Sequence, residues 1–346
     1  VDALKFNSVL TKLDLNDREI DYVLIKDIQE IVSNESRKPP VAVTTLPPLS
    51  DGKTGTESEK SSKQHRFIQF CQKVSQALTG RGRESTAKMT PTSPLTATSN
   101  SSQPTAKMTP MSQLTATSNL SPIAAILSEM KKYEHDYYRQ EECLFRLANL
   151  AVNEENMKKI SEEGGIIRIL FAMKNNSSNE KVQEYGCEAL CNLAMNDINR
   201  KKIAHGIPEI LSAMDMHRYS AKVQHYGCAA LCNLAVNNDN NRVMIADAEG
   251  IYIILSAMSI HSSNADVQQY GCGALWNLAL KNENNKNKIA EEGGIILILS
   301  AMKTNSSNEK VQENGCGALW NFALNDSYKN TIVAEGGITT ILSAMN

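Results

Sequence analysis

The sequence predicts a mainly all-α fold in which similar helical units stack into a solenoid. The segment Gly-Cys-x-Ala-Leu-x-Asn-Leu-Ala recurs with small variations, and its Asn returns after 43, 41, 44 and 44 residues. A second segment, Ile-Leu-x-x-Met, alternates with it, and aromatic residues are only 5% of the chain. A fixed period of this length is typical of stacked supersecondary units. The recurring Asn residues are Asn149, Asn192, Asn233, Asn277 and Asn321.

The composition narrows the classes of partner. The 346 residues carry a formal net charge of −2, which gives no reason to expect nucleic acid as a partner. The apolar runs are shorter than a membrane span, so we expect no membrane insertion. The chain begins with Val1 and stops within a repeat, so we expect a fragment of a longer protein.

Residues 1–35 contain Leu10-x-x-Leu13-x-Leu15 followed by Ile20. This pattern resembles one ribonuclease-inhibitor-type leucine-rich repeat, except that Arg18 replaces the Asn of the motif. We therefore expect residues 1–35 to be a partial, small α/β leucine-rich repeat.

The composition of residues 36–121 predicts a low-complexity disordered linker. The spacing of apolar residues predicts one short amphipathic helix near 65–79. A near copy of the segment at Thr86 begins at Thr105, and both are rich in Ser, Thr and Pro. This part is either a plain tether or a substrate of proline-directed kinases at its Thr-Pro and Ser-Pro pairs: Thr90-Pro91, Ser93-Pro94, Thr109-Pro110 and Ser121-Pro122.

Residues 122–346 hold five units, near 122–163, 164–206, 207–249, 250–292 and 293–335, and a truncated sixth. Within one unit, the pair Gly164-Gly165 allows a sharp turn. A buried helix follows from Ile166 to Met173, then a second helix capped by Ser178 or Asn179. A short third helix is expected over Arg200–Ala204. The second helix has a stripe of core residues: Val182, Cys187, Leu190, Leu193 and Ala194.

The eight cysteines include seven within the array. We expect them to be small buried residues, and the alternatives are a metal site or disulfides. The pairs Cys187/Cys191 and Cys228/Cys232 have i,i+4 spacing, but no His stands at a matching spacing, which disfavours zinc. Unpaired thiols suit a reducing compartment, so we expect a cytoplasmic or nuclear location.

The three recurring segments, Gly-Gly-Ile, Val-Gln-x-x-Gly-Cys-x-Ala-Leu-x-Asn-Leu-Ala and Asn-Lys-x-x-Ile-Ala, together resemble the armadillo repeat over about 122–346. The resemblance implies a right-handed α-α superhelix whose concave groove holds an extended protein segment. It also implies that the recurring Asn binds the backbone of that segment. Importin-type members carry Trp four residues before the Asn; here those positions are Glu188, Ala229, Gly273 and Gly317, which disfavours a nuclear-import receptor.

Helix geometry adds a second ladder to the predicted groove. Asn192 lies roughly opposite the core stripe, and Tyr185, seven residues earlier, shares its face. We expect this face to bind a partner, because carboxamides pair with peptide backbone and tyrosine offers flat contact area. The alternatives are that the Asn bonds a neighbouring helix and that the Trp residues pack between repeats instead of binding. Besides the five Asn residues, the predicted partner-binding residues are Tyr185, Tyr226, Tyr270, Trp276 and Trp320.

No catalytic motif is apparent: we find no phosphate loop, kinase motif set or His-x-x-x-His metal motif. We therefore expect a non-catalytic scaffold that binds protein, with no cofactor, metal or small-molecule substrate. One alternative is the regulatory part of a larger signalling enzyme, such as a kinase, GTPase or ubiquitin ligase. Another is a structural organiser without a peptide groove.

Overall fold

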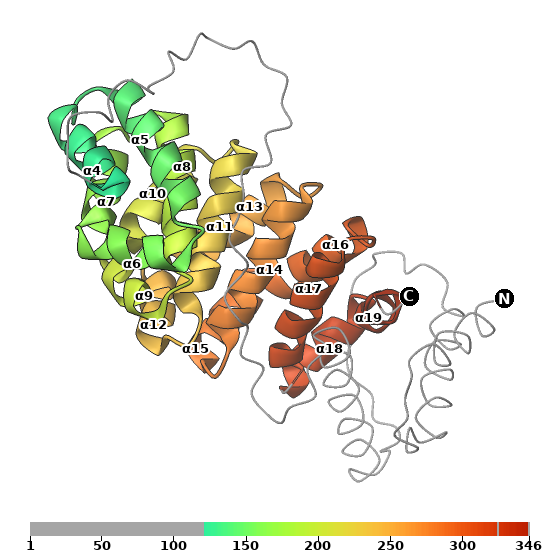
Figure 1. Ribbon diagram of the computed structural model, residues 1–346. Helices are drawn as coiled ribbons and strands as arrows, with labels where there is room; N and C mark the ends of the chain where they lie inside the picture. Colours follow the sequence, from blue (N-terminus) through green and yellow to red (C-terminus); the bar gives the residue numbers. More distant parts are fainter. Residues whose placement is uncertain (1–120, 324, 345–346) are drawn as a thin grey trace, which may run out of the picture. The chain divides into compact units, whose positions relative to one another are not determined.

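The computed structural model describes residues 121–323 and 325–344, and the described residues are helical (Figure 1). The expected leucine-rich repeat of residues 1–35, and the linker with its helix near 65–79, lie outside them. The helices follow one another in triplets of a short helix, a long helix and a second short helix. The first triplets are α4 (Pro122–Lys132), α5 (Tyr137–Leu150), α6 (Glu154–Glu162); α7 (Gly165–Asn175), α8 (Glu180–Leu193), α9 (Asp197–Ile203); and α10 (Ile207–Met216), α11 (Ala221–Ala235), α12 (Asp239–Asp247).

The pattern continues to the end of the described chain. The further helices are α13 (Gly250–Ile260), α14 (Ala265–Ala279), α15 (Glu283–Glu291), α16 (Gly294–Thr304) and α17 (Glu309–Phe322). The helices α4 to α17 belong to one compact unit. The last two, α18 (Asp326–Ala334) and α19 (Gly337–Ser343), contact each other and are described by themselves.

A turn with one left-handed residue leads into the first helix of most units. Gly164 and Gly293 have φ of 82° and 80°, and Glu249 takes the same role with φ 61°. The next residue is a glycine for a different reason, because a Cβ on Gly294 would lie 2.7 Å from the carbonyl oxygen of Ile289. The expected Gly-Gly turn is therefore formed by two glycines with different tasks.

Each long helix is tied to the short helix before it by a glutamine. In the unit of α13 and α14, Gln268 Nε2 donates to the carbonyl oxygens of Met258 at 2.8 Å and His261 at 3.0 Å. These two carbonyls lie at the end of α13, where helical carbonyls lack partners in their own helix. The same pair of bonds is made by Gln140, Gln183, Gln224 and Gln312.

A glycine lets the same two helices approach closely. A Cβ on Gly271 would lie 2.5 Å from Cγ of Met258, so the methionine side chain occupies the space that a larger residue would need. Gly186, Gly227 and Gly315 meet Met173, Met214 and Met302 in the same way.

The core stripe expected on the second helix is buried, as predicted: Val182, Cys187, Leu190, Leu193 and Ala194 are each 0% exposed. The seven described cysteines are also buried and free, in agreement with the expectation of small core residues. Burial raises the pKa of thiols such as Cys187 to about 12.

Two local details sharpen the expectation for the unit. Asn179, not Ser178, is the N-cap of α8, and its side chain accepts from the backbone N–H of Val182. The third helix begins at Asp197, earlier than expected, because Asn196 caps it. The all-α solenoid itself is confirmed. Within the described part, no single helix is long and apolar enough to cross a membrane; α12 and α13 pass such a test only as a pair bent by 73°.

Candidate protein-binding surface

The long helices α5, α8, α11, α14 and α17 pack side by side, each against the next, and we call them the long-helix layer. The recurring Asn residues lie at the same register on these helices. From α8 onward each donates its Nδ2 to a backbone carbonyl one repeat earlier. The bonds are Asn192 to Ala148 at 3.2 Å, Asn233 to Cys191 at 3.1 Å, Asn277 to Cys232 at 3.0 Å and Asn321 to Trp276 at 2.9 Å.

These bonds correct the expectation that the Asn ladder is displayed to a partner. Asn192 and Asn233 are 0% exposed, and Asn277 and Asn321 are 2% and 3% exposed. The helical wheel of one helix placed Asn192 opposite the core stripe, but it took no account of the neighbouring long helix. The alternative interpretation, in which the Asn bonds a neighbouring helix, describes the observed geometry.

Asn149 differs from the other members of the ladder. It is exposed, and its Nδ2 donates 2.8 Å to the carbonyl of Phe145 in its own helix. No described long helix precedes α5, so this Asn has no neighbouring carbonyl of the kind that the others bind.

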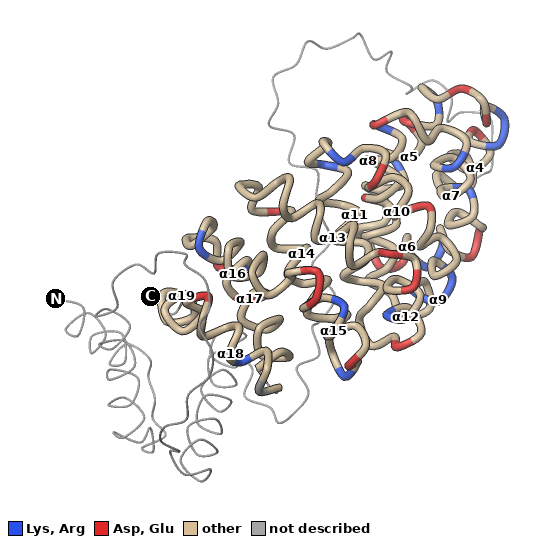
Figure 2. Tube along the Cα trace, turned by 180° about the vertical axis from the view of Figure 1, so that it is seen from behind, with Lys and Arg blue, Asp and Glu red and all other residues tan. Residues whose placement is uncertain are grey.

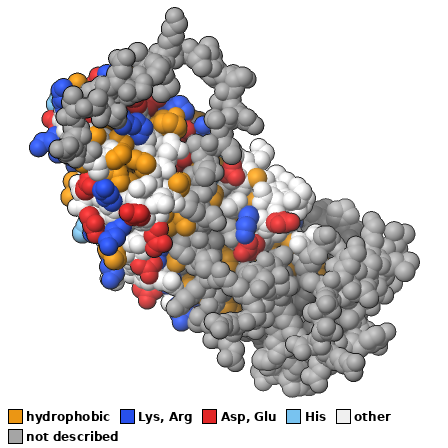
Figure 3. All heavy atoms as spheres, in the orientation of Figure 1, with side chains coloured by type: hydrophobic (Ala, Val, Ile, Leu, Met, Phe, Trp, Pro, Cys, Tyr) orange, Lys and Arg blue, Asp and Glu red, His pale blue; other side chains and the backbone are white. Residues whose placement is uncertain are grey.

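The Tyr ladder is more accessible at one end than at the other. Tyr185 is half-buried, whereas Tyr226 and Tyr270 are 9% and 5% exposed. The Tyr185 ring meets Phe145 edge-on at 5.2 Å, and Lys181 Nζ lies 5.6 Å above it. Figure 3 shows hydrophobic side chains beside Lys and Arg on this face of the molecule, toward the α5 end.

His225 joins two of the tyrosines into one stack, which the sequence analysis did not find. Its ring lies 4.6 Å from that of Tyr226 and 5.1 Å from that of Tyr270, with interplanar angles of 14° and 21°. Burial lowers the pKa of His225, and its buried Nε2 has no hydrogen-bond partner among the residues that the structure describes. The signal in the sequence was its place directly before Tyr226, at the edge of the ladder.

The neighbouring helix α8 carries two buried glutamates, Glu184 and Glu188. Glu184 is 2% exposed, and its carboxylate pairs with Lys181 at 2.7 Å and with Lys222 at 3.2 Å. Glu188, also 2% exposed, accepts a hydrogen bond from the Tyr226 hydroxyl. Burial raises the pKa of Glu188 to about 7, in spite of that bond. The position that distinguishes this chain from importin-type members thus holds a carboxyl group that titrates near neutral pH.

Trp276 packs between repeats. Its side chain is 2% exposed, and its ring fills the space above Gly317, where a Cβ would lie 2.6 Å from three ring carbons. The ring of Trp276 therefore packs between repeats, and contact of its indole edge with a partner stays a prediction. Within the described part of the chain, the buried Nε1 of Trp276 has no hydrogen-bond partner, and the same holds for Nε1 of Trp320.

Charge is sparse along the middle of the array. The helix α13 carries no charged residue and α14 carries only Asp266, as the tube in Figure 2 shows. Among the described residues, no three His, Cys, Asp or Glu side chains are placed to hold a metal ion. The chemistry of this surface is therefore that of aromatic rings, amides and a few carboxylates.

Two family models match the chain. One, described as "LRRK2 ARM repeat", covers residues 205–346, and the other, described as "Armadillo-like", covers residues 120–256. No curated protein matches.

Several solved structures share the fold. An engineered protein is 22% identical, with 65% of this chain and 97% of that chain covered and a TM-score of 0.55. A designed armadillo repeat protein is 18% identical, with 64% and 99% covered and a TM-score of 0.54. Another, in complex with the peptide (KR)4, is 17% identical, with 65% and 100% covered and a TM-score of 0.52. The helices α4 to α17 therefore form an armadillo-repeat solenoid, a fold that generally serves protein binding and is typically non-catalytic.

Proposed function

We propose that the array binds an extended segment of a partner protein along the long-helix layer. The contacts we assign to it are Tyr185, His225, Tyr226, Tyr270 and Trp276. One observation carries the proposal: two ring side chains of this layer, His225 and Trp276, have buried Nε2 and Nε1 atoms without a hydrogen-bond partner among the described residues, and His225 stacks with Tyr226 and Tyr270. Buried polar groups in folded proteins nearly always have a hydrogen-bond partner, so a polar group of a bound segment that pairs with these two atoms would stabilise the complex.

The chemistry of an extended peptide matches this row. Peptide carbonyls accept from the indole N–H of Trp276, and peptide N–H groups donate to a neutral His225. The half-buried ring of Tyr185 gives contact area at a small loss of side-chain entropy. One designed armadillo neighbour holds a peptide, which supports this use of the fold.

The Asn ladder contributes to the proposal in a different way from the one expected. Each Asn fixes the register between consecutive long helices and so sets the spacing of the rings beside it. Binding of the partner backbone by Asn192, Asn233, Asn277 and Asn321 stays a prediction, as does contact with Trp320.

The test is selection of binders from a displayed library of random peptides on the immobilised full chain. Binding of a selected peptide is then measured with Tyr185→Ala and with Trp276→Phe, which keeps the ring and removes the N–H. We expect each change to weaken binding about tenfold or more, as hot-spot contacts do.

The matched control is Tyr219→Ala, because Tyr219 is 81% exposed and lies outside the long-helix layer. If Tyr219→Ala weakens binding as much as the two test variants, or if both test variants bind normally, the proposed surface is wrong.

Three expectations of wider scope stay predictions. They are a cytoplasmic location, the scaffold role itself, and the alternative that a catalytic domain belongs to the same protein. Sequencing the full-length transcript tests the last of these directly.

A further inference from the structure

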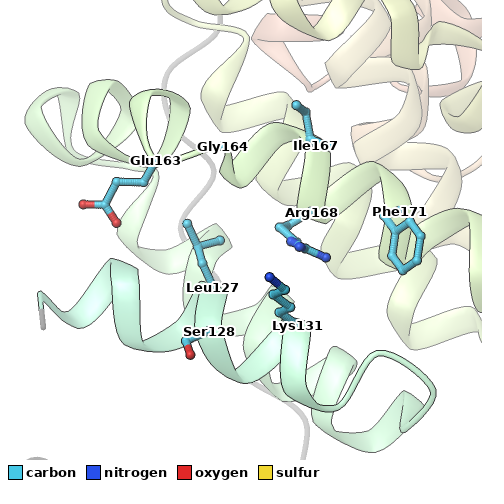
Figure 4. A pocket seen from close by; sticks show the side chains of 8 residues that line it. All are labelled: Leu127, Ser128, Lys131, Glu163, Gly164, Ile167, Arg168 and Phe171. Atoms are coloured by element: carbon cyan, nitrogen blue, oxygen red, sulfur yellow. The ribbon is translucent and has the colours of Figure 1, made fainter. Parts of the chain in front are cut away.

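A hollow of about 550 Å³ opens between α4 and α7, the first short helices of two consecutive units (Figure 4). Leu127 and Lys131 line it from α4, and Ile167, Arg168 and Phe171 line it from α7. Two of its apolar side chains are open to solvent, since Ile167 is 73% exposed and Phe171 is 40% exposed.

Two cations converge in this hollow. Figure 4 shows the side chains of Lys131 and Arg168 pointing toward one another from the two helices. Neither makes an ion pair or hydrogen bond with a described residue, and the one acidic residue at the hollow, Glu163, accepts from Ser121 Oγ at 3.4 Å. Like charges that face each other repel, so this arrangement gains stability when an anion lies between them.

The other repeats show that the fold does not require this arrangement. At the positions that match Lys131 and Arg168, the pair α7 and α10 has Lys174 and Glu209. The later pairs have Asp215 with Ile253 and Ser259 with Leu297. Two facing cations occur at the first of these four junctions alone.

The aromatic side chain is equally particular to this hollow. The position of Phe171 is occupied by serine on the other four matching helices of the compact unit: Ser128, Ser212, Ser256 and Ser300. A dibasic pair and an exposed aromatic ring thus coincide at one junction, whereas the repeat scaffold is the same at all of them.

We propose that this hollow binds an acidic segment of a partner protein. Side-chain carboxylates of the segment lie between Lys131 and Arg168, and a neighbouring apolar side chain packs on Ile167 and Phe171. An arginine guanidinium pairs with a carboxylate through two parallel hydrogen bonds, and the adjacent lysine adds a point charge. The surface lies on other helices than the long-helix layer and does not depend on the function proposed for that layer.

The probe is a fluorescein-labelled peptide in which Glu and Leu alternate, titrated with the full chain at low salt and followed by fluorescence anisotropy. We expect saturable binding that weakens as salt is added. We expect the Lys131→Ala/Arg168→Ala variant to bind about fivefold to tenfold more weakly, and Phe171→Ser to weaken binding by a smaller factor.

Three controls keep the result specific. A Gln and Leu peptide should not bind, Lys174→Ala should bind normally, and Tyr185→Ala should leave this binding unchanged. The double variant Glu209→Arg/Ser212→Phe gives the junction of α7 and α10 the matching Arg and Phe beside Lys174, so it should add a second site.

Failure of the Glu and Leu peptide to bind would overturn the proposal, as would equal affinity for the Gln and Leu peptide or undiminished binding by the Lys131→Ala/Arg168→Ala variant. A phosphoserine peptide that binds more tightly than the Glu peptide, through the same two cations, would replace carboxylate by phosphate and reject the acidic-segment assignment.

Discussion

The two ends of the long-helix layer have the same framework and different side chains at two positions. One residue before the Asn, α8 and α11 carry Cys191 and Cys232, whereas α14 and α17 carry Trp276 and Trp320. Three positions earlier the two ends differ again. The α8 end has a carboxyl group at Glu188 that accepts from Tyr226, whereas α17 has Gly317 beneath the Trp276 ring.

The residues that hold the framework are, in contrast, the same at both ends. Every described long helix has the glutamine that binds two carbonyls, and from α8 onward each has the glycine that meets a methionine. The two positions that lie one and four residues before the Asn therefore differ between the ends without disturbing the fold.

The largest effect should come from Trp276→Ala. This change removes a ring that fills the space between α14 and α17, so we expect a loss of about 3–5 kcal/mol in the free energy of unfolding. Cys232→Ala, at the matching position of the other end, should cost only about 1 kcal/mol because one sulfur atom is removed. Urea unfolding followed by circular dichroism measures both. Equal losses would mean that the two ends are packed alike.

The Asn ladder gives the next largest effect. Asn277→Ala leaves the buried carbonyl of Cys232 without this donor, and we expect a loss of about 1–3 kcal/mol. Asn149→Ala is the matched control, because Asn149 is exposed and bonds only within its own helix; it should cost less than about 0.5 kcal/mol. The same denaturation experiment separates them, and a similar cost for both would contradict the inter-repeat role.

Glu188 gives the α8 end a pH dependence that the Gly positions of α14 and α17 lack. Its pKa is raised in the folded state, so the folded chain binds the extra proton and is favoured below the unfolded value of 4.5. That stability is lost as the pH rises through about 7, where the buried carboxyl ionises. The free energy of unfolding of the Glu188→Gln variant should therefore increase relative to that of the parent chain as the pH rises. The expected difference is on the order of 1–2 kcal/mol after solvent screening.

Unfolding curves of both proteins across this pH window check the prediction. Ala229→Ser serves as the control, since it changes the matching position of α11 without adding a titrating group. A stability difference between Glu188→Gln and the parent that does not vary with pH would rule out titration of Glu188.

The smallest expected effect is a gain. Glu249 adopts φ of 61° where Gly164 and Gly293 stand in two other units, and this region is strained for a residue with a Cβ. Glu249→Gly should raise the free energy of unfolding by about 0.5–1 kcal/mol, partly offset by the greater freedom of glycine in the unfolded chain. Gly293→Ala is the reciprocal test and should destabilise. A gain from both would show that the backbone angle is not the cause.

The periodicity of the sequence was enough to predict the fold, because each unit repeats the same apolar spacing and the same turn glycines. The burial of Val182 and Leu190 follows from one helix alone. The environment of Asn192 does not, since it depends on where the carbonyl of Ala148 lies in the preceding unit. His225 was missed for the same reason: its stacking partner Tyr270 is one repeat away.

The packing of the Trp residues does not follow from one unit alone either. The space over Gly317 becomes meaningful only when the Trp276 ring of the previous unit is placed against it. Properties that belong to one helix were therefore predictable from sequence, whereas those that arise at a junction depend on how the neighbouring unit is placed.

The acceptor of each inter-repeat Asn bond is a backbone carbonyl: that of Ala148, Cys191, Cys232 or Trp276. A main-chain oxygen is present whatever side chain the residue carries, so the bond does not constrain the amino acid at that position. After a unit is duplicated, the copy inherits a working junction while its neighbouring side chain is free to diverge. New binding specificities can accordingly evolve in this array one repeat at a time, while the hydrogen bonds between its units stay the same.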